Sequence, residues 1–417
     1  MTGKWNCVTL KSMQGISYFL QKKNRKGKNM KKFVAILLSL LMVLAIVACT
    51  TKTEEPAKTE EPAKTEETAK TEETAETPAK VYNVAHLVNG NLGDKSFFDS
   101  AESGLKALEE AGRITHKTIE MGGTDEDQPK WLETLYEVAG SGEYDLIVCG
   151  TYQMPDYLKE VATKYPDQKF AIYDDSTYVG ENANVVNITY RQNDMGYLIG
   201  VFAAAMTSDT SVPNMNEQKV VGFIGGVDSP VINDFLYGFL KGVQDTDPEV
   251  KVDTRYVNSY VDTATAKEMA LSMINDNGAD IIWGVAGLSG NGAAEAAAES
   301  GKAWFIGVDS DQELTLPEAQ AAITLTSGLK NVGQSLIWLI DELDAGNEHW
   351  GTMVNLGLNE GGVGVVTDKN FTKVAPQSVQ DTVNAAIAKV AAGEIVVPSA
   401  IGDTEGGVEA LRNSMMP

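Results

Sequence analysis

Residues 303–312, Ala-Trp-Phe-Ile-Gly-Val-Asp-Ser-Asp-Gln, join an apolar run to two closely following acids. A continuous apolar run of this length, bounded by turn signals, is typical of a strand buried on both faces of a parallel sheet. In open α/β sheets, ligands bind just beyond the carboxyl ends of the strands. Asp309 and Asp311 stand at that point. We expect Asp309 to contact a ligand, whereas Asp311 fits equally well as a cap of the next helix.

The same order of strand, turn and helix recurs along most of the chain. Two successive series of this kind predict βαβ units with parallel sheets, arranged in two lobes. Strands are expected over residues 81–88, 144–149, 169–173, 185–189, 219–224, 251–257, 280–285, 304–308, 322–326 and 353–356. Helices are expected over residues 100–111, 155–164, 195–206, 231–244, 263–275, 293–299 and 332–343.

The composition excludes several classes of function. With 417 residues, 43% of them hydrophobic, the chain can bury one large core or two medium ones. The net charge of −24 argues against a nucleic acid partner, since no basic surface meets the phosphates. Cys7, Cys49 and Cys149 have no partner at metal or redox spacing, and three His residues are too dispersed for zinc. We therefore expect no metal and no cofactor, and we expect Cys149 to be inert core.

Residues 30–48 have the pattern of a secretory signal. A basic start is followed by an apolar run too short for a comfortable transmembrane helix. The ending Ile46-Val47-Ala48-Cys49 resembles a bacterial lipobox, which implies a lipoprotein carrying diacylglycerol and palmitate on Cys49. The alternative is an uncleaved anchor that ends in an ordinary Cys. Residues 1–29 are interpreted as an upstream-start artefact or an extended n-region and are left out of the fold.

Residues 49–80 begin with the predicted lipidated Cys and continue as a low-complexity repeat of Lys-Thr-Glu-Glu-Pro-Ala type. Without an apolar face, this repeat cannot offset the entropy of ordering, so we interpret it as a disordered tether. It would span about 30 Å as a coil and at most roughly 100 Å when stretched. A flexible tether is useful when one of its ends is held in place. This supports a lipid anchor on Cys49, at the outer face of the cytoplasmic membrane.

Six segments at the ends of predicted strands combine glycines, aromatics, carboxylates and a lysine. Glycines allow a small molecule to approach the backbone, aromatic rings offer flat faces, and charged groups offer directional partners. A nucleoside needs this combination, because it has a base to stack, an edge to bond and sugar hydroxyls to bind. The segments are residues 90–99, 150–156, 225–230, 286–292, 307–312 and 326–330.

Several short motifs, in their order and spacing, resemble one known family. They are Asp94-Lys95-Ser96-Phe97, Tyr190–Gly200, Gly222–Gly226, Ala279–Ile282, Gly290–Gly292, Ile306–Gln312, Thr326–Asn331 and Gly361–Gly364. Over about residues 81–366 the chain looks like the basic membrane protein family, the PnrA-like nucleoside-binding lipoproteins of ABC transporters. Any one motif is weak, but the set is specific.

The resemblance implies an α/β type I periplasmic-binding-protein fold, with two doubly wound lobes joined by three crossover hinge segments. The N-terminal lobe would comprise residues 81–190, completed by about 310–345. The C-terminal lobe would comprise residues 191–309, completed by about 346–417. The hinges are expected near residues 189–192, 309–312 and 341–346. The ligand would lie in the cleft between the lobes.

The resemblance also implies roles for individual residues. Asp309 and Lys330 would bind the ribose hydroxyls, and Gly287 would offer a backbone contact near the sugar. Phe235 and Tyr152 would sandwich the base, with Tyr152 replacing the more usual Phe. The remaining expected contacts are Phe97, in the amino-terminal motif, and two acids near the base or sugar, Asp94 and Asp156. Two alternatives stay open, a surface salt bridge for Lys330 and a helix core position for Phe235.

One position departs from the family pattern. Phe98 stands where the family usually has Asn, so the base edge loses a polar partner and the preferred base is left open. Phe98 would widen the site to other nucleosides or add stacking.

The sequence thus predicts a monomeric extracytoplasmic binding lipoprotein that delivers nucleosides, purines first, to the permease and ATPase subunits of an ABC importer. The loops lack an activated nucleophile, an acid–base pair or a metal constellation, so no enzyme is expected. A sugar or autoinducer receptor of the same fold is one alternative, and a sensory or adhesive surface lipoprotein is another. A thermal-shift screen with nucleosides and sugars distinguishes the three.

Overall fold

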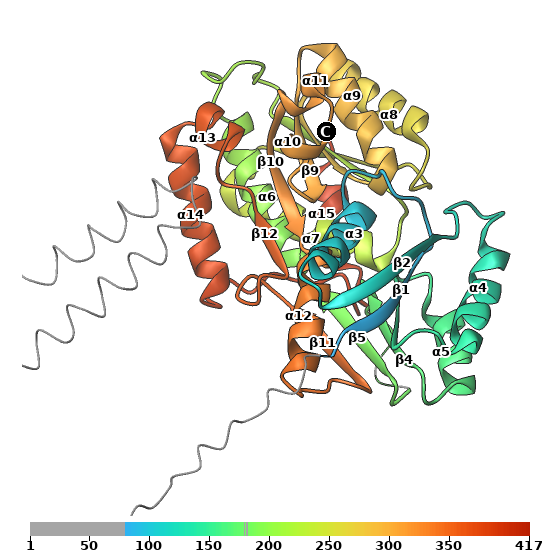
Figure 1. Cartoon of the computed structure of the whole chain (residues 1–417). Coiled ribbons are helices and arrows are strands. Elements are labelled where there is room, and N and C mark those ends of the chain that lie inside the picture. Colours follow the sequence, from blue (N-terminus) through green and yellow to red (C-terminus); the bar gives the residue numbers. More distant parts are fainter. Residues whose placement is uncertain (1–79, 179, 181) are drawn as a thin grey trace, which may run out of the picture. The chain divides into compact units, whose positions relative to one another are not determined.

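A computed structural model describes residues 80–178, 180 and 182–417, all within one structural unit, Glu76–Pro417. The predicted signal at residues 30–48, the lipidation residue Cys49 and the tether up to residue 79 lie outside the described residues. The described chain forms two six-stranded sheets, each with helices on both faces (Figure 1). The prediction of two doubly wound α/β lobes is confirmed.

The first sheet has the strand order β11-β5-β4-β3-β1-β2, and every neighbouring pair is parallel. Apolar residues fill its central strands because helices cover both faces. Its strands are β1 (Tyr82–Val88), β2 (Ile114–Glu120), β3 (Leu146–Gly150), β4 (Lys169–Tyr173), β5 (Val185–Tyr190) and β11 (Thr352–Leu356). Its helices are α3 (Phe97–Glu110), α4 (Gln128–Ser141), α5 (Pro155–Lys164) and α12 (Val332–Asp344).

The second sheet has the order β12-β10-β9-β8-β6-β7, and only β12 runs antiparallel to its neighbour. Its strands are β6 (Val220–Gly225), β7 (Lys251–Tyr256), β8 (Ala279–Val285), β9 (Trp304–Asp309), β10 (Thr324–Lys330) and β12 (Val363–Val365). Its longer helices are α6 (Gln192–Thr207), α7 (Pro230–Thr246), α8 (Thr263–Asp276), α9 (Gly290–Ser300), α14 (Gln377–Ala391) and α15 (Gly407–Met415). Shorter elements are η2 (Gly287–Ser289), α10 (Gln312–Thr315), α11 (Glu318–Ala321) and α13 (Asn370–Val374).

The chain passes between the sheets three times, after β5, after β10 and after β11. The first passage, at Arg191, lies within the hinge predicted at residues 189–192. The other two lie at Asn331 and at residues 357–362, whereas residues 309–312 stay in the second lobe and 341–346 in the first. The predicted completing segments differ in the same way. Strand β10 pairs with β9 in the second sheet, and β11 pairs with β5 in the first.

Each sheet is buried between two layers of helices. In the first lobe, α4 and α5 contribute Trp131 and Leu158 to one core, while α3 and α12 cover the opposite face. In the second lobe, α8 and α9 cover one face, and α6 and α7 pack against the other (Figure 1). As predicted, Cys149 is buried within β3. Burial raises the pKa of its thiol to about 12, so it is an inert core group.

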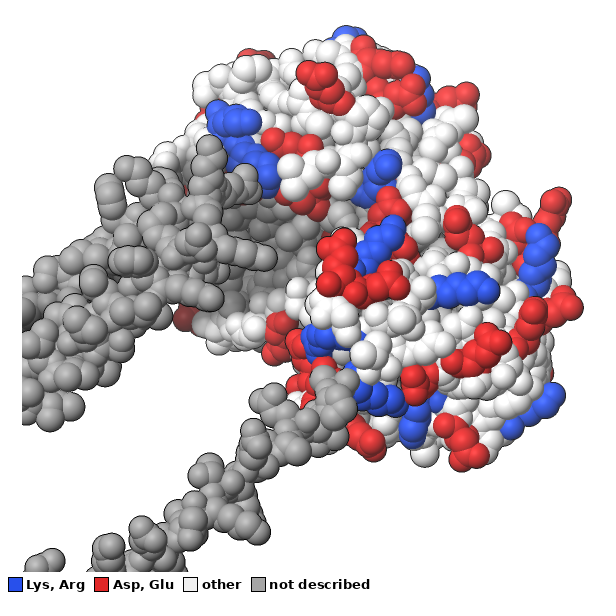
Figure 2. Space-filling model, viewed as in Figure 1, with Lys and Arg blue, Asp and Glu red and all other residues white. Residues whose placement is uncertain are grey.

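The surface and the helices carry two further observations. On the face shown in Figure 2, acidic and basic side chains of the described residues are interspersed. Among residues 80–178, 180 and 182–417, no helix is long and apolar enough to cross a membrane.

Candidate functional site

A cavity opens between the carboxyl ends of the two sheets, where loops from both lobes meet. From the first lobe it is lined by Asn89, Gly90, Asn91, Asp94, Phe97, Phe98, Gly123, Thr151, Tyr152, Gln153 and Asp174. From the second lobe it is lined by Val231, Ile232, Phe235, Tyr260, Val261, Val285, Gly287, Leu288, Asp309 and Lys330. The position agrees with the rule that ligands bind beyond the carboxyl ends of parallel strands.

One end of the cavity is charged and buried. Lys330 ends β10 with 1% of its surface exposed, and its Nζ donates to Oδ1 of Asp174 at 2.5 Å. Its ammonium also lies 4.4 Å from the ring centroid of Phe235, a cation–π contact. Lys330 is therefore a buried cavity residue and not a surface ion pair. Burial raises the pKa of Asp174, and the nearby Lys330 opposes that shift.

Asp309 lies beside this pair, at the end of the strand that neighbours β10. Leu329 is the register partner of Asp309, so Lys330 and Asp309 leave adjacent strands at the same edge. Burial raises the pKa of Asp309 to about 7, and Lys330 counteracts part of that effect. Its Oδ1 is buried and accepts no hydrogen bond from the described residues. A buried acceptor of this kind is matched to a hydroxyl or amide donor on a ligand.

Asp94 lines the cavity but its carboxylate is largely committed to the protein. Its Oδ1 accepts from the backbone N–H groups of Ser96 at 3.0 Å and Asp99 at 3.1 Å, and its Oδ2 accepts from Phe98 at 2.8 Å. These N–H groups open α3, so Asp94 caps the helix that presents Phe97 to the cavity. Burial nonetheless raises the pKa of this carboxyl.

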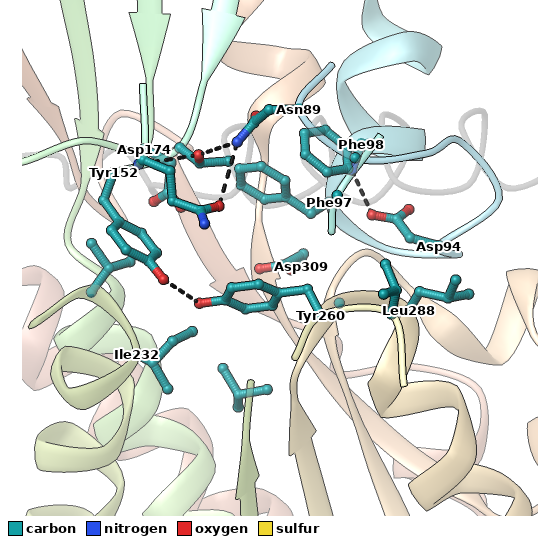
Figure 3. A pocket seen from close by; sticks show the side chains of 18 of the residues that line it. Asn89, Asp94, Phe97, Phe98, Tyr152, Asp174, Ile232, Tyr260, Leu288 and Asp309 are labelled. Atoms are coloured by element: carbon teal, nitrogen blue, oxygen red, sulfur yellow. Dashed lines mark hydrogen bonds between the residues drawn. The ribbon is translucent and has the colours of Figure 1, made fainter. Parts of the chain in front are cut away.

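Aromatic rings from both lobes face the same space. The hydroxyls of Tyr152 and Tyr260 lie 3.2 Å apart and join the loop after β3 to the loop after β7 (Figure 3). Phe97 and Phe98 are T-shaped to one another, with centroids 5.1 Å apart. Phe235 lines the cavity and also packs on Trp283 in the core, so it is both a core residue and a cavity wall. Such rings offer faces for a flat ligand.

The structure brings the predicted site residues together with one exception. Asp94, Phe97, Tyr152, Phe235, Gly287, Asp309 and Lys330 line the cavity. Asp156 lies instead in the first turn of α5, exposed and outside the lining residues. Asp311 makes no capping bond to α10, and its Oδ2 accepts from Lys369 at 2.7 Å.

Several cavity residues were absent from the predicted set, among them Asp174, Asn89, Gln153 and Tyr260. Asp174 follows β4 as Asp309 ends β9, so the strand-end signal that singled out Asp309 was present for it too. Gln153 lies within the predicted site segment 150–156 but was not chosen as a contact. Asn89 and Tyr260 lie in loops whose approach to the cavity depends on the fold, and no spacing in the sequence indicates them.

The polar groups of this cavity are hydrogen-bonding groups. Among residues 80–178, 180 and 182–417, no group of three or more His, Cys, Asp or Glu side chains could hold a metal ion. Carboxylates, a lysine and amides are present as hydrogen-bonding groups around an aromatic lining.

Comparisons with known proteins agree with this arrangement. Residues 81–400 match the family model described as ABC transporter substrate-binding protein PnrA-like. The chain is 30% identical to Basic membrane protein A of Borreliella burgdorferi over 325 residues, covering 77% of this chain and 89% of that protein. It is also 30% identical to the ABC transporter nucleoside-binding protein BmpA of Lactococcus lactis subsp. cremoris, covering 73% and 86% of the two chains.

A solved structure carries the same fold. The ABC transporter solute-binding protein of Aeropyrum pernix K1 superposes with a TM-score of 0.66 at 26% identity, covering 81% of this chain and 100% of that chain. The family and the neighbour are solute-binding proteins and not enzymes. The chain belongs to the PnrA-like family of ABC transporter substrate-binding proteins.

Proposed function

We propose that this protein binds a nucleoside, a purine nucleoside first, and delivers it to the permease and ATPase subunits of an ABC importer. The observation that carries the proposal is the joining of an aromatic lining to a buried charged end in one cavity. That the Lactococcus relative is named a nucleoside-binding protein supports it.

The charged end matches the sugar. Oδ1 of Asp309 lacks a donor among the described residues, and two vicinal hydroxyls supply such donors. Lys330 lies close enough to balance the carboxylate charge while it stays bound to Asp174. The negative excess of Asp94, Asp174 and Asp309 over this single lysine opposes a phosphate group, so a nucleoside fits better than a nucleotide.

The aromatic lining matches the base. Phe97, Tyr152, Phe235 and Tyr260 surround the cavity, and stacking on one such ring is worth about 1–3 kcal/mol per base. A free pentose would use the charged end and leave the aromatic lining without a partner. The sugar alternative therefore predicts tight binding of ribose alone, which the nucleoside proposal does not.

Calorimetry with Asp309→Ala and Phe235→Ala tests the proposal. Asp309→Ala removes the hydroxyl acceptor and should weaken ribonucleoside binding by about 2–4 kcal/mol, roughly 30- to 1000-fold. A 2′-deoxynucleoside lacks one hydroxyl, so wild-type protein should bind it less tightly, and Asp309→Ala should largely erase that difference. Phe235→Ala should weaken both ligands about equally.

Ribose and free nucleobase serve as controls, since each offers half of the interactions. The nucleoside proposal is wrong if Asp309→Ala binds ribonucleosides like the wild type, or if ribose alone binds as tightly as any nucleoside.

We also propose that the protein is anchored to the outer face of the cytoplasmic membrane through lipid on Cys49. The lipobox-like sequence and the repeat after it support this location. Cys49→Ser should move the processed protein from the membrane fraction to the soluble fraction, since stable anchoring requires more than one acyl chain. A processed Ser variant that stays in the membrane fraction would contradict the anchor.

A further inference from the structure

Three polar side chains form a connected group in the first-lobe part of the cavity lining. Asn89 directly follows β1, with 4% of its surface exposed. Its Nδ2 donates to Oγ1 of Thr151 at 2.8 Å and to Oε1 of Gln153 at 3.4 Å. All three residues line the cavity (Figure 3 labels Asn89).

Thr151, the partner of the Asn89 amide, is itself held in place by its backbone. Thr151 has a φ of 75°, its N–H donates to the carbonyl of Tyr173, and its carbonyl accepts from Met154. Its Oγ1 also accepts from the backbone N–H of Gln153 at 3.3 Å. In the structure the Thr151 hydroxyl oxygen accepts from both the Gln153 backbone N–H and Nδ2 of Asn89.

Counting donors and acceptors leaves one group of Asn89 unmatched. A side-chain amide has two N–H donors and one carbonyl acceptor, and both donors are used by Thr151 and Gln153. Oδ1 of Asn89 is buried and accepts no hydrogen bond from the described residues. Gln153 accepts through Oε1, so its Nε2 is the group left for a partner. A buried amide oxygen without a donor is costly, so a ligand that brings an N–H is favoured.

The neighbouring ring supplies no substitute. Phe98 lies over Gly90 so closely that a Cβ on Gly90 would stand 2.3 Å from the Phe98 ring. This part of the lining therefore combines an aromatic ring with the side-chain amides of Asn89, Asn91 and Gln153.

We propose that Asn89 determines specificity for the base, with its Oδ1 accepting a hydrogen bond from an N–H on the base edge. Nε2 of Gln153 donates to the ring nitrogen or carbonyl oxygen beside that N–H. Inosine offers the pair as N1–H and O6, and adenosine as its amino group and N1. Purine riboside has the same sugar and ring system but no N–H on its base. The inference rests on the proposed nucleoside-binding function.

Calorimetric titration of inosine, adenosine and purine riboside tests it. Whichever of inosine and adenosine binds the wild-type protein more tightly should bind it about tenfold or more tightly than purine riboside does. Leucine is similar in size to asparagine but has no acceptor. In Asn89→Leu the affinities for the preferred nucleoside and for purine riboside should therefore differ by no more than about threefold. Asn89→Asp keeps an acceptor toward the ligand, because the Thr151 hydroxyl can donate to the other carboxylate oxygen, and should retain the preference. This variant also covers the case that Asn89→Leu fails to fold.

Asn216→Leu is a matched control, because Asn216 is a loop amide at the opposite edge of the second sheet, bonded to the Gly278 carbonyl. It should leave the preference unchanged. An unchanged preference in Asn89→Leu, or its loss in Asn89→Asp, overturns the role of Asn89 and leaves nucleoside binding intact. If no ribonucleoside binds the wild type, the proposed function fails, and the inference fails with it.

Discussion

Asp309 combines two unfavourable features at one residue. Its φ of 63° lies in the left-handed region, which Asp and Asn tolerate better than most residues, and its carboxylate is buried. Burial raises its pKa to about 7 from a usual value of 3.8. Between about pH 4 and pH 7 the folded protein therefore holds a proton that the unfolded chain has lost, so this residue makes stability fall as pH rises through that window.

Asp309→Asn should stabilise the protein in the absence of ligand at pH 8 by roughly 1–3 kcal/mol, because the buried charge is removed without new backbone strain. The gain should shrink toward zero near pH 4, where the wild-type carboxyl is protonated. Urea unfolding at several pH values measures both quantities, and the same variant should lose ribonucleoside affinity. A pH-independent difference in stability between the two proteins would contradict the raised pKa.

At this scale the sequence indicated the site wherever a side chain directly follows a buried strand. Asp309 was predicted for that reason and Lys330 through the family resemblance, whereas Asp174 carries the strand-end signal without having been chosen. Asp156, which was predicted to contact the ligand, does not line the cavity. It lies in the first turn of a helix, where a shift of one position turns a side chain away from the cavity. The pairing of Lys330 with Asp174 joins two lobes, and no local pattern contains it.

Two helices of the second lobe approach so closely that their glycines are required. A Cβ on Gly200 of α6 would stand 2.2 Å from the carbonyl oxygen of Phe239, and one on Gly242 of α7 would stand 2.1 Å from that of Tyr197. The obstructing atoms are backbone, which cannot rotate away. The contact sets the position of α7 and, with it, that of Phe235 in the cavity wall.

Gly200→Ala should therefore destabilise the protein by about 1–3 kcal/mol, despite a gain in helix propensity of up to about 1 kcal/mol. Gly140→Ala is the matched control. Gly140 also lies in a helix, but its Cβ would meet only the hydroxyl of Tyr165, the far end of a side chain, at 2.9 Å. Chemical unfolding should show a loss for Gly200→Ala and little change for Gly140→Ala. Equal effects would contradict the backbone contact.

Most elements could be predicted from periodicity, and the misses have physical causes. Strand β2 is a half-exposed edge strand, and its polar sequence hides it. Strand β10 extends to Lys330. The predicted strand ended at residue 326 because Ser327-Gly328 resembles a turn in the sequence. Gly328 is needed for close packing and not for a turn, since a Cβ there would stand 2.2 Å from the sulfur of Met195 in α6.

Across the whole described unit, several hydrogen bonds join the two lobes around the cavity. The hydroxyl of Ser310 donates to the carbonyl of Ser96 at 2.8 Å, and that of Thr315 donates to the carbonyl of Lys95 at 3.0 Å. Further contacts are the tyrosine hydroxyl pair, the buried Lys330–Asp174 pair, and the amides of Gln312 and Asn291, which donate to the carbonyls of Lys95 and Asp94. The hydroxyl-to-carbonyl bonds at the rim exchange readily with water, so we expect the lobes to separate about the three crossovers.

Small-angle scattering should record this motion as a smaller radius of gyration at saturating nucleoside than without it. The ligand should close the cleft because it bonds to both lobes at once. Asp309→Ala, titrated with the same nucleoside concentration, should keep the profile of the protein without ligand. Identical profiles for the wild type with and without ligand would argue against hinge closure.

The buried thiol in β3 has a practical consequence for such measurements. Cys149 is inaccessible and protonated at neutral pH, so alkylating dyes should pass it by. Among the described residues, Cys149 is the one cysteine, and it forms no disulfide. A cysteine introduced at an exposed rim position such as Asn91 would then be the reactive thiol of this region, and an environment-sensitive fluorophore on it would turn the protein into an optical reporter of its own ligand.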